Sequence, residues 1–231
     1  MGILLDPGQR GIIIGQTGSG KTLGAIWHMQ QAPFDNVIVL DTKGEPNFNK
    51  LARDDETINF YNSAAAFSSA LKKPLANFSI VRPEPNELID LDYLDSVLMD
   101  IYNRGRECLV YVDEAYQWHI NGRAGAGLTG LLTRGRSKGI STLLSTQRPA
   151  WISRFCFSES QKFYVYKLSD KRDVKTVSEH IPELFSYFVV KPYHFWFYDN
   201  ASDMDQAGFF KPVPMPELKN LAVDDVGRKW L

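Results

Sequence analysis

Short runs of branched apolar residues recur along the chain, and each has the length of a buried strand. The run GIIIG lies between two glycines, and the run FSIVRP ends at Pro83. The predicted buried strands are 11–15, 36–41, 78–83, 108–114, 140–147 and 162–168. An aromatic run, YHFWFYD (193–199), predicts a further strand near an edge of the sheet.

Segments with helical spacing separate these strands. One helix is expected from Lys21 to about Gln31, where Pro33 stops it, and another covers 170–181. The segment 129–139 begins as a helix. In 91–105 the apolar residues recur at intervals of three and four and Gly105 ends the pattern; they are Leu91, Leu94, Val97, Leu98 and Ile101.

Continuous apolar strands that alternate with helices indicate an α/β fold with a mostly parallel central sheet flanked by helices. The chemistry of such sheets lies at the carboxyl ends of the strands. We expect a single domain with a core at 1–200 and a C-terminal tail at 201–231. The tail includes KPVPMPELKN (211–220), whose prolines predict an extended segment that lies on a surface or reaches a neighbour.

Composition limits the kinds of partner. The net charge of −1 means that any contact with nucleic acid must come from a local basic patch. Cys108 and Cys156 have neither C-x-x-C nor zinc-site spacing, so they are interpreted as reduced core thiols of a cytosolic protein. No apolar run reaches the roughly 18 residues of a membrane span, and no signal peptide is expected.

The strongest motif follows the first predicted strand. The sequence GQTGSGKT fits the pattern G-x-x-x-x-G-K-[ST], in which glycines let backbone amides approach phosphate groups. Lys21 is expected to reach the β and γ phosphates, and the Thr22 hydroxyl to bind Mg²⁺. The alternative is a glycine-rich turn that matches by chance. The expected nucleotide-binding residues are Gly15, Gln16, Thr17, Gly18, Ser19, Gly20, Lys21 and Thr22, together with Asp113.

Polar residues also end two other predicted strands. Asp113 and Glu114 follow a buried run; Asp113 suits contact with Mg²⁺ through water, and Glu114 suits a general base that activates water. Gln147 ends the strand 140–147, where an amide can sense the γ phosphate and hold the attacking water. For both sites the alternative is a strand that ends in polar residues for structural reasons.

The distribution of charge is uneven. No Asp or Glu occurs from Ala115 to Ser158, although the stretch holds several cations, which predicts an anionic partner. Within it, NGRAGAGLTG (121–130) is interpreted as a flexible glycine-rich loop whose arginine contacts a phosphate backbone without reading sequence. The alternative is a loop that is only mobile. Arg123 and Lys138 are the expected DNA contacts.

Together, over roughly residues 10 to 170, these motifs resemble the FtsK/HerA superfamily of DNA-pumping ATPases. RSKGISTLLSTQRP (136–149) is similar to the superfamily segment with an arginine, a glycine turn, a strand and then Gln-Arg-Pro. The short form is most similar to genome-packaging ATPases of tectivirus-like phages and archaeal icosahedral viruses. The resemblance implies a RecA-like P-loop fold, ATP and Mg²⁺ as cofactors, and DNA, most simply double-stranded, as the substrate.

The same resemblance implies further properties. Arg136 occupies the position of an arginine finger supplied by the neighbouring subunit, with Arg134 as the reserve. It also implies a homo-oligomeric ring, a hexamer or pentamer, that works with capsid-vertex or portal proteins in the host cytoplasm and the virion. Two features depart from the pattern: LDTKGE (40–45) is closer to type IV coupling proteins, and the aromatic strand and proline tail match no known part.

Three functions compete at this stage. The first is a motor that pumps double-stranded DNA into a preformed capsid. The second is an export ATPase of the zonula occludens toxin or conjugative coupling type, although those proteins normally carry a transmembrane segment. The third is a small-molecule kinase or regulatory NTPase, which needs no acid-free arginine stretch. Hydrolysis stimulated by DNA separates the two motors from the third function.

Overall fold

The computed structural model describes residues 2–55, 57–73, 77–120, 122–181, 191–201 and 208–213. Within these residues a nine-stranded sheet has the order β11-β10-β9-β1-β8-β5-β2-β4-β3, and its seven strands from β9 to β3 run parallel. Its strands are β1 (Arg10–Ile14), β2 (Asn36–Leu40), β3 (Ile58–Tyr61), β4 (Phe78–Val81), β5 (Cys108–Val112), β8 (Ser141–Thr146), β9 (Lys162–Val165), β10 (Phe195–Asp199) and β11 (Gly208–Phe210).

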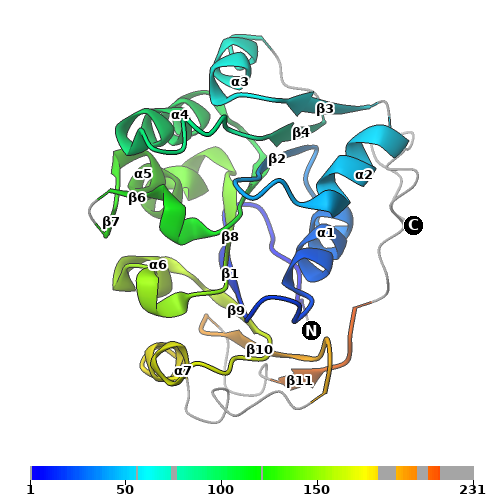
Figure 1. Cartoon of the computed structure of the whole chain (residues 1–231), viewed down its shortest axis with the longest axis vertical. Coiled ribbons are helices and arrows are strands. Elements are labelled where there is room, and N and C mark those ends of the chain that lie inside the picture. The colour runs from blue at the N-terminus through cyan, green and yellow to red at the C-terminus, as the bar shows by residue number, and fades with distance from the viewer. Residues whose placement is uncertain are drawn as a thin grey trace.

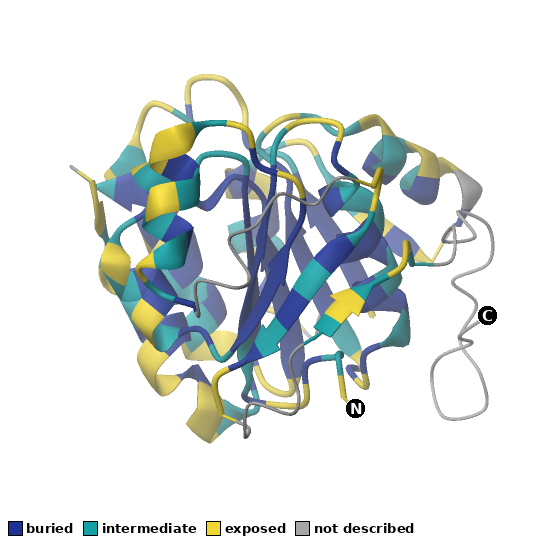
Figure 2. Cartoon of the chain, turned by 90° about the horizontal axis from the view of Figure 1, so that it is seen from below, coloured by how far each residue is buried: buried dark blue, intermediate teal, exposed yellow. Residues whose placement is uncertain are grey.

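Helices cover both faces of this sheet (Figure 1). The helices α1 (Lys21–Gln31) and α2 (Pro46–Asp54) lie on one face, where Ile26 and Phe48 join the core. The opposite face carries α3 (Ala64–Ala70), α4 (Leu91–Arg104), α5 (Ala126–Arg134), α6 (Arg154–Glu159) and α7 (Lys171–Ser178). The strands are buried between the two layers, as Figure 2 shows. The predicted α/β fold with a mostly parallel sheet is therefore confirmed.

The helix α4 illustrates how local sequence sets the elements. The side chain of Asp90 accepts a hydrogen bond from the amide of Tyr93 at the helix start, and Gly105 follows its last residue. Four members of the predicted apolar stripe, Leu94, Val97, Leu98 and Ile101, are fully buried. Each CH₂ group buried in this way contributes about 0.8 kcal/mol, so the stripe fixes which face of α4 meets the sheet.

The structure also contains elements that the sequence patterns did not predict. These are α2, β3, α3 and α6, the short hairpin of β6 (His119–Ile120) and β7 (Arg123–Ala124), and the 3₁₀ turns η1 (Ala115–Trp118), η2 (Gly135–Lys138) and η3 (Pro149–Trp151). The edge strand β3 has only four residues, and its burial does not extend over the whole strand. A strand this short at the edge of a sheet carries little periodicity, so its sequence does not predict it.

The expectation of one flexible loop over 121–130 is wrong for its second half. The helix α5 begins at Ala126, earlier than the predicted start, and Gly127 packs directly against the backbone of α4. Asp95 of α4 accepts hydrogen bonds from the amides of Gly127 (2.9 Å) and Leu128 (3.2 Å). The glycines here permit close packing of two helices rather than movement.

The aromatic strand is followed by one more strand within the described residues. The strand β10 pairs with β9 and with β11, antiparallel in both cases. Because β11 comprises Gly208–Phe210, part of the segment 201–231 lies in the central sheet. Of the proline-rich stretch 211–220, all but 211–213 lies outside the described residues.

Candidate nucleotide-binding and hydrolysis site

A glycine-rich loop connects the carboxyl end of β1 to the first turn of α1. Gly18 and Gly20 have φ of 74° and 104°, a region that favours glycine. A Cβ on Gly15 would lie 2.6 Å from Cβ of Tyr166, so this position also excludes a side chain. The loop therefore keeps its backbone bare where a phosphate group would approach.

Lys21 starts α1 directly after this loop. Its ammonium donates a hydrogen bond to the carbonyl oxygen of Gln16, 3.2 Å away, so the side chain lies over the loop. Burial lowers the pKa of Lys21, while the nearby carboxylate of Glu114 acts in the opposite direction. A cation held here lies where phosphate oxygens would replace the carbonyl as its partner. Thr22 follows and is half-buried.

Two carboxylates follow β5 at the same edge of the sheet. Asp113 accepts a hydrogen bond from the hydroxyl of Tyr111 at 3.2 Å, and its pKa is raised to about 7 by burial and by the charge of Glu114. Glu114 is almost fully buried and has φ of 45°, a left-handed conformation that is costly for a residue other than glycine. Backbone strain at a buried acid is typical of functional sites.

Glu114 has a cationic partner that the sequence analysis did not identify. The ammonium of Lys43 forms an ion pair with Glu114 across 71 residues of sequence. Lys43 belongs to the stretch LDTKGE, which was noted only as a departure from the family pattern. The unusual composition of that stretch was the one available signal, because nothing in it indicates which acid the lysine meets.

The turn that presents Lys43 is organised by a buried carboxylate. Asp41 accepts hydrogen bonds from the amides of Gly44 (3.0 Å) and Glu45 (3.1 Å). The guanidinium of Arg82 pairs with the same carboxylate, with Nε at 3.1 Å. Because Asp41 is fully buried, these charge-assisted bonds fix the turn after β2.

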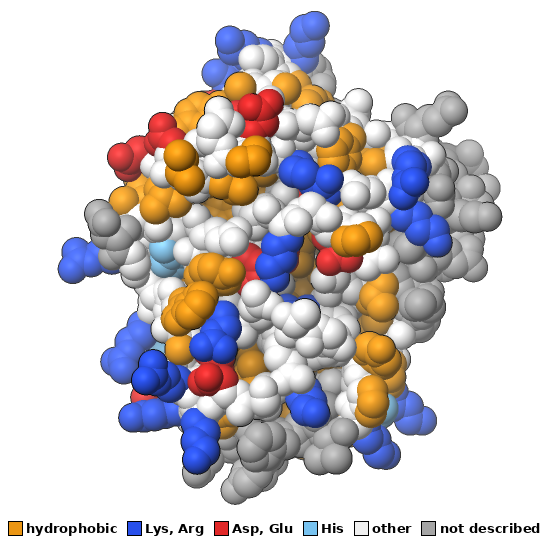
Figure 3. All heavy atoms as spheres, in the orientation of Figure 1, with side chains coloured by type: hydrophobic (Ala, Val, Ile, Leu, Met, Phe, Trp, Pro, Cys, Tyr) orange, Lys and Arg blue, Asp and Glu red, His pale blue; other side chains and the backbone are white. Residues whose placement is uncertain are grey.

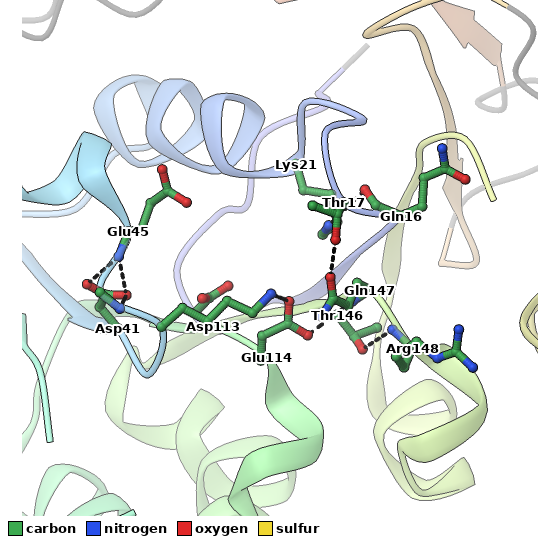
Figure 4. Close-up of polar contacts among 12 residues, drawn as sticks. Gln16, Thr17, Lys21, Asp41, Glu45, Asp113, Glu114, Thr146, Gln147 and Arg148 are labelled. Carbon is green, nitrogen blue, oxygen red and sulfur yellow. Dashed lines mark hydrogen bonds and ion pairs between the residues drawn. The ribbon is translucent and has the colours of Figure 1, made fainter. Parts of the chain in front are cut away.

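Gln147 connects the two halves of the site. Its amide oxygen accepts a hydrogen bond from the Thr17 hydroxyl, and its backbone amide donates to the Glu114 carboxylate at 3.2 Å. Figure 4 shows this chain of contacts from the glycine-rich loop through Gln147 to Glu114. The structure thus brings together the three strand ends that the sequence analysis assigned to one site.

The polar atoms at this edge fit a bound nucleotide. Among the described residues, Gln16 Oε1, Ser19 Oγ and Thr42 Oγ1 are buried without a hydrogen-bond partner in the protein. Buried polar atoms normally have partners, so a ligand with donors, acceptors and bound ions is the kind of group that would satisfy them. The backbone amides of the glycine-rich loop and the ammonium of Lys21 supply the positive potential that a phosphate group requires.

The predicted arginine finger lies away from this site. Arg136 is exposed in η2, before β8 begins, and its Cγ would meet a side chain at Gly8. Gly8 precedes β1, and β1 and β8 are parallel, so Arg136 lies at the amino edge of the sheet. The loop lies at the carboxyl edge, about 15 Å away at roughly 3.3 Å per residue of β1. Arg136 is therefore remote from the glycine-rich loop of its own chain.

The two cations closest to Arg136 in the sequence, Arg134 and Lys138, both contact α4. The guanidinium of Arg134 lies over the ring of Tyr102, 5.3 Å from the ring centre. Lys138 donates to the carbonyl oxygen of Tyr102 at 2.6 Å and lies over the same ring. The ammonium of Lys138 thereby stabilises the C-terminus of α4, a structural contact that the sequence did not reveal.

Acidic residues from other parts of the chain lie close to cations of the acid-free stretch 115–158. Arg148 pairs with Asp170 (3.6 Å) and Asp173 (3.4 Å), which come from outside the stretch. Arg154 pairs with Glu179 at 3.0 Å. Of the two expected DNA contacts, Arg123 is the exposed one, at the β6–β7 hairpin.

No model of a known protein family matches the chain. The sequence is, however, 32% identical to the DNA packaging ATPase P9 of Enterobacteria phage PRD1, over 96% of this chain and 94% of that protein. The chain belongs to the family of this DNA packaging ATPase. The predicted resemblance to packaging ATPases of tectivirus-like phages is therefore confirmed.

Solved structures share the fold of this packaging-ATPase chain at low sequence identity. The genome packaging NTPase B204 from Sulfolobus turreted icosahedral virus 2, in complex with AMPPCP, matches with a TM-score of 0.67 and 17% identity. The match covers 90% of this chain and all of that one. VirB4 of Thermoanaerobacter pseudethanolicus matches with a TM-score of 0.64 and 10% identity over 90% of both chains.

Among the residues described by the structure, none of the helices combines the length and the apolar character needed to cross a bilayer.

Proposed function

We propose that this chain is an ATP-hydrolysing motor that drives double-stranded DNA into a preformed viral capsid. The observation that carries the proposal is the contact chain Thr17–Gln147–Glu114, which joins the glycine-rich loop to a buried acid. The membership in the family of the DNA packaging ATPase P9 supports DNA as the substrate. A kinase would need a second substrate hydroxyl, whereas a buried acid beside Gln147 favours attack by water.

The residues divide the work of hydrolysis as follows. The amides of Gly15–Lys21 and the ammonium of Lys21 bind the phosphates. Thr22 would bind Mg²⁺ directly, and Asp113 would contact the ion through a water molecule. Mg²⁺ held by these residues would supply positive charge next to the phosphate oxygens. Because the pKa of Asp113 is about 7 without a cation, a metal nearby stabilises its charged form.

Glu114 acts as the general base in this proposal. It accepts the proton of the attacking water, while Gln147 positions that water and detects the γ phosphate through Thr17. Lys43, which pairs with Glu114, orients the base within a buried site. The finger Arg136, or else Arg134, then comes from the next subunit of a hexameric or pentameric ring, and stabilises transition-state charge.

The proposed DNA surface lies on the side of the sheet that carries the β6–β7 hairpin. Figure 3 shows Lys and Arg side chains gathered there, over α6 and α7. A phosphate backbone matches an exposed set of cations better than a mixed surface does. The ring is proposed to act at a capsid vertex, with portal or vertex proteins as partners, in the host cytoplasm and the virion. The exposed cations of the β6–β7 hairpin, α6 and α7 are Arg123, Arg154, Lys171, Arg172 and Lys175.

The experiment that tests the function measures ATP hydrolysis with and without duplex DNA at increasing salt. We expect stimulation by DNA of any sequence and a steep loss as salt rises, because counterions are released on binding. Glu114→Gln should bind ATP and lose about 10²- to 10⁴-fold in turnover, and Lys21→Ala should lose turnover altogether. Wild-type turnover in Glu114→Gln would remove Glu114 from its role.

A matched pair of variants tests the DNA contact. Arg123→Ala should weaken the stimulation and leave basal turnover intact, since the β6–β7 hairpin that carries Arg123 lies apart from β1 and α1, which the glycine-rich loop connects (Figure 1). Arg53→Ala is the control, because Arg53 is also an exposed arginine but lies on α2, on the opposite face of the sheet. Stimulation that requires one DNA sequence, or that ignores salt, would contradict the proposal.

A further inference from the structure

One exposed aromatic residue lies directly against the glycine-rich loop. A Cβ placed on Gly20 would lie 3.0 Å from Cδ1 of Tyr193 and 3.6 Å from its Cα. The buried ring of Tyr166 approaches the same point, with Cε1 at 3.5 Å. Gly20 therefore lies between a buried ring and an exposed one. Tyr193 is 53% exposed, so much of its ring is uncovered.

The backbone of Tyr193 has an unfavourable conformation. Its φ is 61°, in the left-handed region that aromatic residues rarely adopt. A residue held in this way, at a ligand-binding edge, is a reason to look for a role of the side chain. The conformation places the ring on the loop instead of in the core formed by Phe195 and Phe197.

The order of the strands indicates which part of a nucleotide reaches Tyr193. Glu114 and Gln147 follow β5 and β8, on one side of β1, and they mark the position of the γ phosphate. The strands β9 and β10 lie on the other side of β1. Trp196 is paired with Val165, the last residue of β9, so Tyr193 lies beyond the carboxyl end of β9. A triphosphate with its γ group toward Glu114 directs its nucleoside toward Tyr193.

We infer that Tyr193 forms the nucleobase subsite, where its exposed ring stacks on a purine base such as adenine. The inference rests on the proposed ATPase function and adds the residue that recognises the nucleoside. A planar apolar ring suits a purine because stacking requires no fixed hydrogen-bond pattern. Gly20 is part of the same subsite, since a side chain there would meet the tyrosine ring.

The test compares two ligands and two variants by calorimetric titration in the presence of Mg²⁺. The ligands are ATP and inorganic tripolyphosphate, which lacks a nucleoside. Tyr193→Asn removes the ring, and asparagine tolerates the left-handed backbone, so the fold is retained. Tyr193→Phe keeps the ring and removes only the hydroxyl. Thermal unfolding of both variants checks that the fold is intact.

We expect Tyr193→Asn to weaken ATP binding by about 5- to 150-fold, the range of base–aromatic stacking, and Tyr193→Phe to change it less than about twofold. Binding of tripolyphosphate should be equal in all three proteins. Equal losses for ATP and tripolyphosphate would mean that the ring only supports the loop, and unchanged ATP binding would mean that another group holds the base. Either result would overturn the inference about Tyr193. Neither result would contradict the proposed hydrolysis of ATP at the glycine-rich loop.

Discussion

At the scale of single residues, the ion pair of Lys43 with Glu114 joins a partly exposed cation to the buried acid of the site. The Glu114 side chain is 1% exposed and the Lys43 side chain 36% exposed, so the acid is buried while the lysine partly faces solvent. Removing one member of a buried pair leaves an uncompensated charge, which costs about 3–5 kcal/mol when both members are buried. Solvent reduces that figure here because Lys43 is partly exposed.

We therefore predict that Lys43→Met lowers the free energy of unfolding by about 1–3 kcal/mol and reduces ATP turnover. Methionine keeps the length of the side chain and removes its charge. Urea denaturation of the wild type, the two single variants and Lys43→Met/Glu114→Gln gives a double-mutant cycle. A coupling energy near zero would show that the two residues do not stabilise each other.

The residues of the site differ in how far sequence could predict them. Lys21, Glu114 and Gln147 were predicted because each ends or follows a recognisable apolar strand. Lys43 was not, since its partner lies 71 residues away and only the fold brings them together. Lys138 shows the converse case: its charge indicated DNA, whereas its ammonium contacts the carbonyl of Tyr102.

At the scale of elements, the packing of α5 on α4 depends on one glycine. A Cβ on Gly127 would lie 2.6 Å from the amide nitrogen of Met99, and closer still to the carbonyl oxygen of Asp95. These are backbone atoms of α4, which cannot move aside as a side chain can. The two helices can therefore approach only where this position lacks a side chain.

We predict that Gly127→Ala lowers the free energy of unfolding by about 1–3 kcal/mol, the usual range for overpacking. Gly130→Ala is the control, because its Cβ would meet the ring of Tyr102 at 3.2 Å, and a side chain can yield. Urea denaturation measures the free energy of unfolding of both variants, provided that the m-value is unchanged. Equal stability of the two variants would contradict the assigned contact.

The central elements were predictable and the peripheral ones were not. The strands β1, β2 and β5 are buried on both faces, so each contains a continuous apolar run that is easily recognised. The stretch NGRAGAGLTG gave the wrong expectation because glycine content alone does not distinguish a mobile loop from a close helix contact. Only the position of α4 makes that distinction.

At the scale of the whole molecule, the nucleotide loop and the proposed arginine finger lie at opposite edges of the sheet. The nucleotide loop, Glu114 and Gln147 lie at the carboxyl edge, and Arg136 lies at the amino edge beside Gly8. A finger at the opposite edge can complete a site only in another copy of the chain. Contacts of this head-to-tail kind close into a ring when the rotation between copies permits it.

This arrangement predicts the behaviour of mixed rings. Arg136→Ala should bind ATP normally and lose about 10³- to 10⁵-fold in turnover, because such an arginine acts on transition-state charge. Lys21→Ala should also be inactive, yet it keeps the finger. Mixing the two inactive proteins should restore part of the activity, because some interfaces then join an intact loop to an intact finger. Turnover of the wild type should also rise more steeply than linearly with concentration as dilute protein assembles.

The mixing experiment is read together with a measurement of assembly by analytical ultracentrifugation. A matched mixture of Lys21→Ala with Glu114→Gln is the control, since both defects there lie at the carboxyl edge and the finger is intact in each. In that mixture every subunit lacks either Lys21 or Glu114, so no interface contains a complete carboxyl-edge site. Activity should therefore stay at the level of the single variants. If the mixture of Arg136→Ala with Lys21→Ala co-assembles and remains equally inactive, Arg136 is structural, and Arg134, which lies over the ring of Tyr102, becomes the residue to test.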